Sequence, residues 1–197
     1  MSDLFTSSSI DQNLESPLAN KMRPQSLDEV IGQHHLLAEG APLQNMISSG
    51  IFSSFILWGP PGVGKTTIAR LLAEHSKSHF EQLSAIFTGV SDLKKVFEAA
   101  KIRRTNGHKT IIFVDEIHRF NKSQQDSFLP FLEDGTITLI GATTENPSFE
   151  LNSSILSRVQ VLVLERLTNS NLENLFDRAE SLLGSQINLD LDAKTEL

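Results

Sequence analysis

The stretch FILWGPPGVGKTTIARLL, Phe55 to Leu72, changes character twice. It begins with four apolar residues, passes through a turn rich in glycine and proline, and ends with apolar residues at the spacing of one helix face. This order predicts a buried strand, a loop and a helix. A cation, Lys65, and two hydroxyls, Thr66 and Thr67, stand where the loop gives way to the helix.

The loop has the pattern G-x-x-x-x-G-K-[ST], which is typical of phosphate binding. Glycines let consecutive backbone N–H groups point at one anion, and the helix N-terminus adds partial positive charge. Lys65 is expected to reach the β- and γ-phosphates, and Thr66 to ligate Mg²⁺. A glycine-rich turn with a solvated lysine is the alternative. The predicted phosphate loop consists of Gly59, Pro60, Pro61, Gly62, Val63, Gly64, Lys65, Thr66 and Thr67.

The segment TIIFVDEIHRF brings two carboxylates, Asp115 and Glu116, to the carboxyl end of an apolar strand. Ligands bind at this end of the strands in open α/β sheets. We expect Asp115 to hold the Mg²⁺ shell and Glu116 to orient and deprotonate the attacking water. The alternative is a strand that ends in a solvated acidic turn.

Two further segments carry candidate residues. LIGATTENP is a predicted strand that ends in Thr143 and Thr144, and a hydroxyl there could position the water beside the γ-phosphate; Thr144 is preferred because it comes later. Alternatively, the two threonines have no role in the reaction and are present because threonine favours strands. ILSRVQVLVL places Arg158 before the last predicted strand, where the residues alone favour a surface arginine.

Strands that are apolar throughout alternate with helices, which predicts a parallel sheet covered on both faces, an α/β fold. The strands are expected at residues 54–58, 80–86, 110–115, 136–142 and 159–164. Helices are expected at 65–75, after an N-cap at Ser91, and after a capping box of Asn121 and Gln124 with a kink at Pro130. A short helix ends at residues 155–158, and residues 17–37 are expected to be loop around one helical turn.

The chain divides into three predicted parts. Residues 1–16 are rich in Ser, Asp, Asn and Gln and are expected to form a flexible tail. Residues 17–166 form the nucleotide-binding α/β domain. Residues 167–197 begin a helical element, with a capping box of Ser170 and Glu173 and no strand after it.

Composition narrows the class of protein. The chain contains no cysteine, which excludes disulfides and thiolate metal sites and fits a reducing cytoplasm. Its apolar runs are too short to span a bilayer, and its start lacks the features of a secretory signal, so no membrane partner is expected. The net charge is −7. Six cations nevertheless lie on one predicted helix and the loop that follows it: Lys94, Lys95, Lys101, Arg103, Arg104 and Lys109. They could contact nucleic-acid phosphates, or they could form a solvated face.

Four segments together resemble the AAA+ ATPases of the clamp-loader clade, and more closely the replication-associated recombination protein A group, which includes the Werner-helicase-interacting ATPase. They are GPPGVGKTT, VDEIHRF, IGATTENPSFELNSSILSR and PLANKMRPQSLDEVIGQHHLL. The resemblance runs from about Pro17 to Ala179, and TTENPSFELN is its most specific part. The junction motor RuvB is similar around DEIHR and GATT.

The resemblance implies a three-layer P-loop NTPase sandwich with a five-stranded parallel sheet in the order 5-1-4-3-2. It implies that Lys65 and Thr66 belong to Walker A, Asp115 and Glu116 to Walker B, and Thr144 to sensor 1. It makes Arg158 an arginine finger that acts in trans, hence in a homo-oligomer. Val30, Ile31 and Gly32 are then expected to line the adenine pocket.

The implied activity is Mg²⁺-dependent ATP hydrolysis coupled to DNA at replication forks, gaps or ends, in recombination and repair, in the cytoplasm near the nucleoid. The sequence contains no Asn-Lys-x-Asp guanine motif, which favours adenine. Members of the group continue into a longer lid, with a sensor 2 arginine, and an oligomerisation domain, whereas this chain has no arginine after Arg178. A shortened chain is therefore expected, and two alternatives stay open: a nucleotide-binding module that does not hydrolyse, and a clamp-loader or RuvB-like subunit.

Overall fold

The structure is a computed structural model that describes residues 17–185. The tail predicted at residues 1–16 and the end of the element predicted at residues 167–197 lie outside the described residues. The described chain divides into two compact units. One unit is Ser26–Arg166, and the other consists of residues 17–25 and 167–185.

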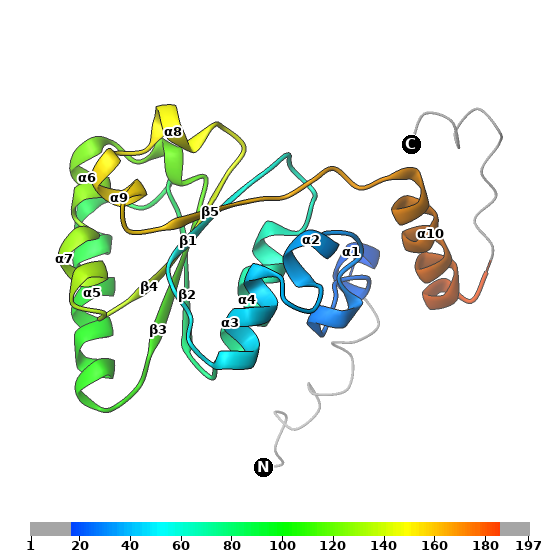
Figure 1. Ribbon diagram of the computed structural model, residues 1–197, viewed down its shortest axis with the longest axis horizontal. Coiled ribbons are helices and arrows are strands. Elements are labelled where there is room, and N and C mark those ends of the chain that lie inside the picture. The colour runs from blue at the N-terminus through cyan, green and yellow to red at the C-terminus, as the bar shows by residue number, and fades with distance from the viewer. Residues whose placement is uncertain (1–16, 186–197) are drawn as a thin grey trace, which may run out of the picture. The chain divides into compact units, whose positions relative to one another are not determined.

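Strands and helices alternate along the larger unit (Figure 1). Before the first strand come η1 (Leu27–Glu29), α2 (His34–Leu37) and α3 (Pro42–Ser49). The alternating part then runs β1 (Phe55–Trp58), α4 (Lys65–His75), β2 (His79–Ser84), α5 (Val90–Thr105), β3 (Thr110–Asp115), η2 (Ile117–Arg119), α6 (Lys122–Asp126), α7 (Leu129–Glu133), β4 (Thr138–Thr143), α8 (Pro147–Glu150), α9 (Ser153–Leu156) and β5 (Gln160–Val163). The smaller unit contains α1 (Leu18–Lys21) and α10 (Asn169–Leu183).

The described strands form one five-stranded sheet in the order β2-β3-β4-β1-β5, and every pair is parallel. This confirms both the parallel sheet and the order 5-1-4-3-2. In the register, Phe55 at the start of β1 lies opposite Ile140 of β4 and Gln160 of β5. All strands therefore point the same way, and their carboxyl ends meet at one edge of the sheet.

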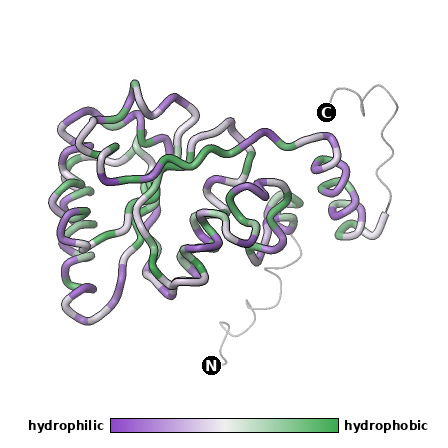
Figure 2. Tube along the Cα trace, in the orientation of Figure 1, coloured by the Kyte–Doolittle hydropathy of each residue, from purple (hydrophilic) through white to green (hydrophobic). Residues whose placement is uncertain are grey.

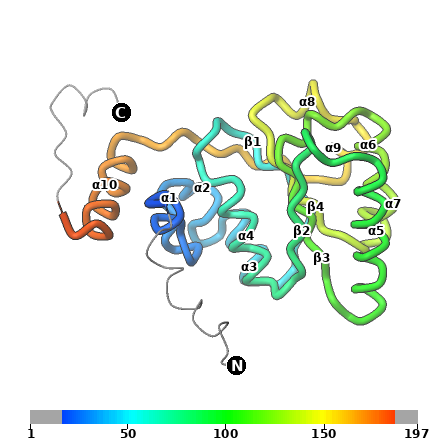
Figure 3. The backbone as a smooth tube through the Cα atoms, turned by 180° about the vertical axis from the view of Figure 1, so that it is seen from behind, coloured from blue at the N-terminus to red at the C-terminus, as the bar shows by residue number. Residues whose placement is uncertain are grey.

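Helices cover both faces of the sheet, because the strands carry apolar side chains on both faces. On one face, Phe55 and Phe113 pack with α2, α3 and α4. On the other, Ile56 and Ile112 pack with α5, η2 and Phe128, the residue before α7. Figure 2 shows the central strands largely hydrophobic, and Figure 3 shows the sheet between α4 and α5 from behind. The three-layer α/β architecture is confirmed.

Two helix starts differ from the predictions. The N-cap of α5 is Gly89, not Ser91, because the Asp92 carboxylate reaches back and accepts a hydrogen bond from the Gly89 N–H at 3.3 Å. The N-cap of α10 is Thr168, whose hydroxyl accepts from Asn171 N at 3.3 Å; Ser170 therefore lies inside the helix. Helix α5 therefore begins two residues earlier than predicted, with a carboxylate of its first turn bonded to the N-cap backbone, and α10 begins two residues earlier at a hydroxyl cap.

Other boundaries also differ. Strand β2 ends at Ser84, two residues before the prediction, and the following Ile86 side chain is exposed. Pro130 does not kink one long helix: it lies in the first turn of a second helix, α7, where its missing N–H costs no intrahelical bond. Residues 34–37, predicted as loop, form α2. The capping box of Asn121 and Gln124 is present, with hydrogen bonds of 2.9 and 3.0 Å.

Candidate functional site

The loop between β1 and α4 has a backbone that only glycine adopts without strain at two positions. Gly62 and Gly64 have φ angles of 81° and 95°, and Gly64 is the residue from which α4 starts. Gly59 is confined for another reason: a Cβ there would lie 2.5 Å from the Leu164 carbonyl oxygen. The glycines therefore allow the loop to turn sharply into the helix and to pack against the end of β5.

Lys65, the first residue of α4, lies over this loop and is 9% exposed. Its Nζ donates hydrogen bonds of 2.7 Å each to the carbonyl oxygens of Gly59 and Pro60. Burial lowers the pKa of the Lys65 ammonium, while the negative charges of Glu116 and Asp115 oppose that shift and favour the charged form. The loop lysine and the two carboxylates thus belong to one electrostatic cluster, although they are about 50 residues apart in the sequence.

Asp115 and Glu116 stand at the carboxyl end of β3, between β2 and β4. Glu116 has φ 53° and ψ 46°, the left-handed region that a residue with a long side chain seldom adopts. Strained backbone of this kind costs on the order of 1–3 kcal/mol and is concentrated at functional sites. The strained residue is the one predicted to activate water.

The carboxyl end of β4 lies beside the phosphate loop and the acid pair. Thr143 is fully buried and lies opposite Trp58 in the register, and its carbonyl oxygen accepts a hydrogen bond from Gly59 N at 3.2 Å. Its hydroxyl lies 2.9 Å from His118 Nδ1 and accepts from Glu145 N at 3.0 Å. Thr144, the preferred sequence candidate, follows the strand and is half-buried. Both threonines therefore lie where the strands have their carboxyl ends. Of the two hydroxyls, that of Thr143 makes more hydrogen-bond contacts.

Oxygen ligands for a divalent cation are available at this edge. Thr66 follows Lys65 in the first turn of α4, and Asp115 acts electrostatically on Lys65. A hydroxyl and a carboxylate are hard oxygen ligands that suit Mg²⁺, and substrate phosphates and water commonly complete its octahedral shell. The chemistry of these two residues fits the ion.

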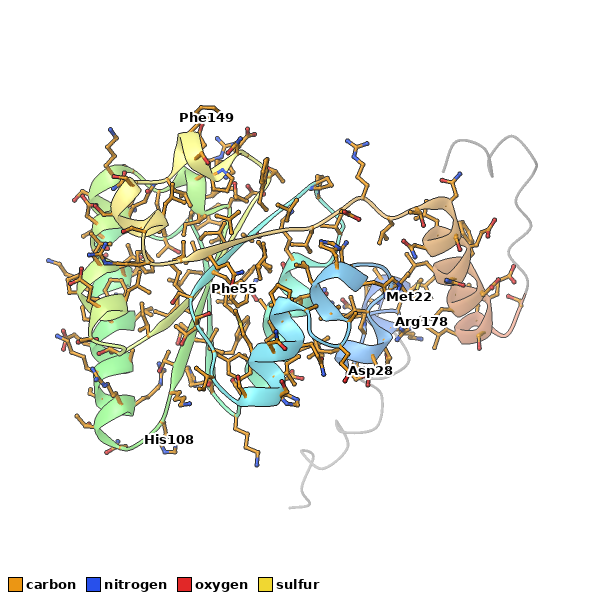
Figure 4. All side chains as sticks on the ribbon, in the orientation of Figure 1. Met22, Asp28, Phe55, His108, Phe149 and Arg178 are labelled. Atoms are coloured by element: carbon orange, nitrogen blue, oxygen red, sulfur yellow. The ribbon has the colours of Figure 1, made fainter. Side chains whose placement is uncertain are left out.

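Arg158 is not near this cluster. It precedes β5, at the edge of the sheet where the strands begin, and its Nη2 forms a 2.6 Å ion pair with Glu133 Oε1. Its Nη1 donates to Ser154 O at 2.8 Å. Figure 4 shows the two edges through two labelled residues: His108, before β3, and Phe149, after β4, lie at opposite ends of the sheet.

The predicted adenine segment follows η1. Val30 packs against the same core cluster that contains Val63 of the phosphate loop, and Gly32 has a φ angle of 76°. The next residue, Gln33, is buried, and its side-chain amide forms two hydrogen bonds with the backbone of Glu165, at 2.8 and 3.0 Å. The segment is thereby fixed between the phosphate loop and the end of β5.

A family model described as "ATPase family associated with various cellular activities (AAA)" matches residues 55–167, more than half of the chain. The chain belongs to the AAA family of ATPases. The matched residues include β1 to β5 and every residue of the phosphate loop and the acid pair.

Within the AAA family, the chain is similar to proteins named for replication and recombination. It is 53% identical over 167 residues to the Replication-associated recombination protein A of Escherichia coli, a match that covers 85% of this chain and 37% of the relative. It is 50% identical to the ATPase WRNIP1 of Dictyostelium discoideum, over 83% of this chain and 19% of that one. The chain thus spans well under half the length of these relatives.

Among solved structures, the fold is similar to the RuvB Holliday junction branch migration motor of Thermotoga maritima. The TM-score is 0.68 at 31% identity, covering 83% of this chain and 55% of the other. Among the helices in the described part of this AAA ATPase domain, none is long and apolar enough to cross a membrane.

The cations of α5 and its exit are largely neutralised in this AAA ATPase domain. Lys95 pairs with Asp92 and Lys101 with Glu98 within the helix. Arg103 lies 3.4 Å from Glu81 and Arg104 3.4 Å from Asp134. Of the two alternatives left open by the sequence, these contacts favour a solvated, ion-paired face over a binding surface for nucleic-acid phosphates.

Sequence reasoning missed one residue of the site, His118. Its ring contacts Glu116 and Thr143, which were both candidates. The available signal was its position two residues after Glu116 in VDEIHRF, at the end of a buried strand. That signal alone does not show whether the ring turns toward the acid or away from it.

Proposed function

We propose that this domain binds Mg²⁺–ATP in the loop of residues 59–67 and hydrolyses it. One observation carries the proposal: the loop with its buried Lys65 follows the carboxyl end of β1, and Asp115 and Glu116 stand at the carboxyl end of β3 in the same parallel sheet. The negative charges of both carboxylates accordingly favour the ammonium form of Lys65. Lys65 binds the β- and γ-phosphates, which requires it to exchange the carbonyls of Gly59 and Pro60 for phosphate oxygens.

The other residues take roles at the same edge. Thr66 and Asp115 hold Mg²⁺, which neutralises charge on the phosphates when bound. Glu116 orients the attacking water and accepts its proton. Thr144 contacts the γ-phosphate or the water, and residues 30–32 hold the adenine. Arg158 acts on nucleotide held by a second copy of the chain.

In the longer protein, we propose that hydrolysis is coupled to DNA at replication forks, gaps or ends, in recombination and repair near the nucleoid. The names of the similar proteins support this coupling, since they refer to replication-associated recombination and to branch migration. A RuvB-like or clamp-loader subunit is a related possibility, and a branch-migration assay and a pull-down with a sliding clamp distinguish it.

A nucleotide-dependent binding module that does not hydrolyse is the second candidate. The position of Arg158 favours it for this chain alone, because the arginine is held by Glu133 at the edge where the strands begin. A chain that stays monomeric then does not have Arg158 at its own nucleotide.

Phosphate release tests these candidates. It is measured for this chain and for a longer protein that contains it, with saturating Mg²⁺–ATP, with and without forked DNA, beside a titration with fluorescent nucleotide. Turnover that DNA stimulates supports the first candidate. Tight binding with no turnover in either protein supports the binding module, and absence of binding contradicts both.

A further inference from the structure

A histidine with a largely buried side chain connects the acid end of β3 with the end of β4. The His118 side chain is 8% exposed and belongs to η2, directly after the left-handed residue Glu116. Its Nδ1 lies 2.9 Å from Thr143 Oγ1 and 3.3 Å from Glu116 Oε2. One ring nitrogen therefore faces both the proposed water-activating carboxylate and a fully buried hydroxyl.

The position of the proton on this ring follows from the neighbours. The Thr143 hydroxyl has a single proton and lies 3.2 Å from the Glu145 carbonyl oxygen, to which it can donate, while it accepts from Glu145 N. An ionised Glu116 carboxylate has no proton to donate. A proton on Nδ1 suits both neighbours, because it can be donated to Thr143 Oγ1 and it turns the positive end of the N–H toward the Glu116 carboxylate, whereas a bare Nδ1 would place its lone pair beside that carboxylate. We therefore assign the His118 proton to Nδ1.

The contact is one of three that connect the phosphate loop to Glu116 by way of Thr143 and His118. Gly59 N, in the first residue of the phosphate loop, donates to Thr143 O, and the Thr143 side chain meets His118, which meets Glu116. Thr144, the proposed γ-phosphate contact, is the next residue after Thr143. The orientation of Glu116 is thereby connected to the loop and strand that would surround the terminal phosphate.

We propose that His118 is a positioning residue for hydrolysis: its Nδ1–H orients the Glu116 carboxylate and connects that orientation to Thr143 at the end of β4. The inference rests on the proposed function, because it requires Glu116 to activate water. His118 itself touches neither nucleotide nor water in this role. The competing interpretation is a core histidine whose hydrogen bonds only stabilise the fold.

The first test reads the tautomer without any nucleotide. A long-range ¹H–¹⁵N spectrum of the labelled chain, at a mildly alkaline pH where imidazole is neutral, is expected to show the His118 proton on Nδ1. Thr143→Val, which removes the hydroxyl but keeps the shape, should shift the His118 Nδ1 resonance, whereas Thr143→Ser should not. The exposed His108 serves as the internal reference. A proton found on Nε2 would overturn the inference.

The second test separates positioning from folding. An asparagine amide can place a donor near the position of Nδ1, while glutamine places it near Nε2 and leucine has none. His118→Leu and His118→Gln should lower kcat by about 10- to 100-fold, the scale seen when a group that orients another is lost, with KM and nucleotide affinity unchanged. His118→Asn should recover most of the rate. His108→Leu, at the other edge of the sheet, is the matched control.

The outcomes show separately whether the inference fails and whether the proposed function fails. If the parent protein turns over ATP, Glu116→Gln does not, and His118→Leu keeps the parental kcat, the inference fails and the proposed function stands. The inference also fails if His118→Asn loses as much rate as His118→Leu. If neither this chain nor the longer protein turns over ATP, the proposed function fails, and the inference, which depends on it, fails as well.

Discussion

Arg158 and Lys65 lie at opposite ends of the same parallel sheet. Lys65 follows the carboxyl end of β1, whereas Arg158 precedes β5, whose first residue lies opposite Phe55, the first residue of β1. An arginine at the edge where strands begin cannot reach a phosphate held where they end. If Arg158 contacts a nucleotide at all, as proposed above, that nucleotide must be bound to another copy of the chain.

Mixing two inactive variants tests this relationship. In the longer protein, Arg158→Ala is expected to lower turnover by about 1,000-fold or more, as loss of an arginine finger does, while nucleotide affinity is kept. When Arg158→Ala is mixed with Glu116→Gln, each Arg158→Ala subunit can receive the intact arginine of its neighbour. Part of the turnover should return, measured as phosphate release against mixing ratio. Arg166→Ala is the control, and a mixture that stays as inactive as its components contradicts the role in trans.

Lys65→Ala is expected to weaken nucleotide binding. A hydrogen-bonded charge contributes about 1.5–3 kcal/mol, so the dissociation constant should rise about 10- to 100-fold. Titration with fluorescent ATP measures the change, and Lys94→Ala, an exposed lysine on α5, is the matched control. Equal affinity for the Lys65 variant and the parent would show that the lysine does not contact the phosphates.

Glu116→Gln is expected to bind nucleotide and not to cleave it. Glutamine has the same shape and leaves Thr66 and Asp115 untouched, but it cannot accept the proton of water, so kcat should fall by about 100-fold or more. Phosphate release and the same titration give the two quantities. Cleavage at the parental rate would mean that another group is the base.

Gly59→Ala is expected to destabilise the domain. The added Cβ would lie 2.5 Å from the Leu164 carbonyl oxygen, which is backbone and cannot turn aside. Overpacking of this kind typically costs about 1–3 kcal/mol of unfolding free energy. Gly141→Ala is the comparison, because its Cβ would meet mainly the tips of Ile56 and Ile117, which can rotate. Urea unfolding should show the larger loss for Gly59→Ala, and the reverse order would contradict the role of this contact.

The Asp134 carboxyl is expected to make the unfolding free energy of the domain depend on pH. Hydrogen bonding from Thr136 lowers the pKa of the Asp134 carboxyl below its ordinary value, and its Oδ1 accepts from Thr136 N at 2.7 Å. Because the folded pKa is lowered, this contribution to stability is present above the ordinary carboxyl pKa and is lost as the pH falls through the folded pKa. Asp134→Asn should therefore reduce the difference in unfolding free energy between neutral and strongly acidic solution. Asp28→Asn is the control, and an unchanged difference in the Asp134 variant argues against this contribution.

The sequence predicted the sheet well because its strands are apolar on both faces, a pattern that few other structures share. Strand β3 was predicted with its observed bounds, since Thr110 and Asp115 mark a clear change in polarity. The missed helix α3 had its own signals, a proline at its start and Gly50 at its C-cap, but its apolar residues are sparse. The start at Thr168 was misplaced because several polar residues in a row can cap a helix, and the start at Gly89 because a glycine N-cap has no side chain to mark it.

The site was predictable where the spacing of residues fixes the chemistry, and less so where it depends on side-chain direction. The loop of Lys65 and the acid pair at the end of β3 could be found from local patterns alone. The contact of His118 with Thr143 joins residues 25 positions apart, and it depends on the left-handed turn at Glu116. No local pattern predicts that turn, so no reading of VDEIHRF alone could show where the ring points.

The two hydrogen bonds between the Gln33 side-chain amide and the Glu165 backbone join parts of the domain that are far apart in the sequence. Glu165 is almost the last residue of the larger unit, and the chain that follows is attached to it through Arg166. A displacement of Glu165 is therefore expected to act on the segment of residues 30–32, which directly precedes Gln33, as well as on β5. If residues 30–32 hold the adenine, the binding of a base and the position of Glu165 should depend on each other.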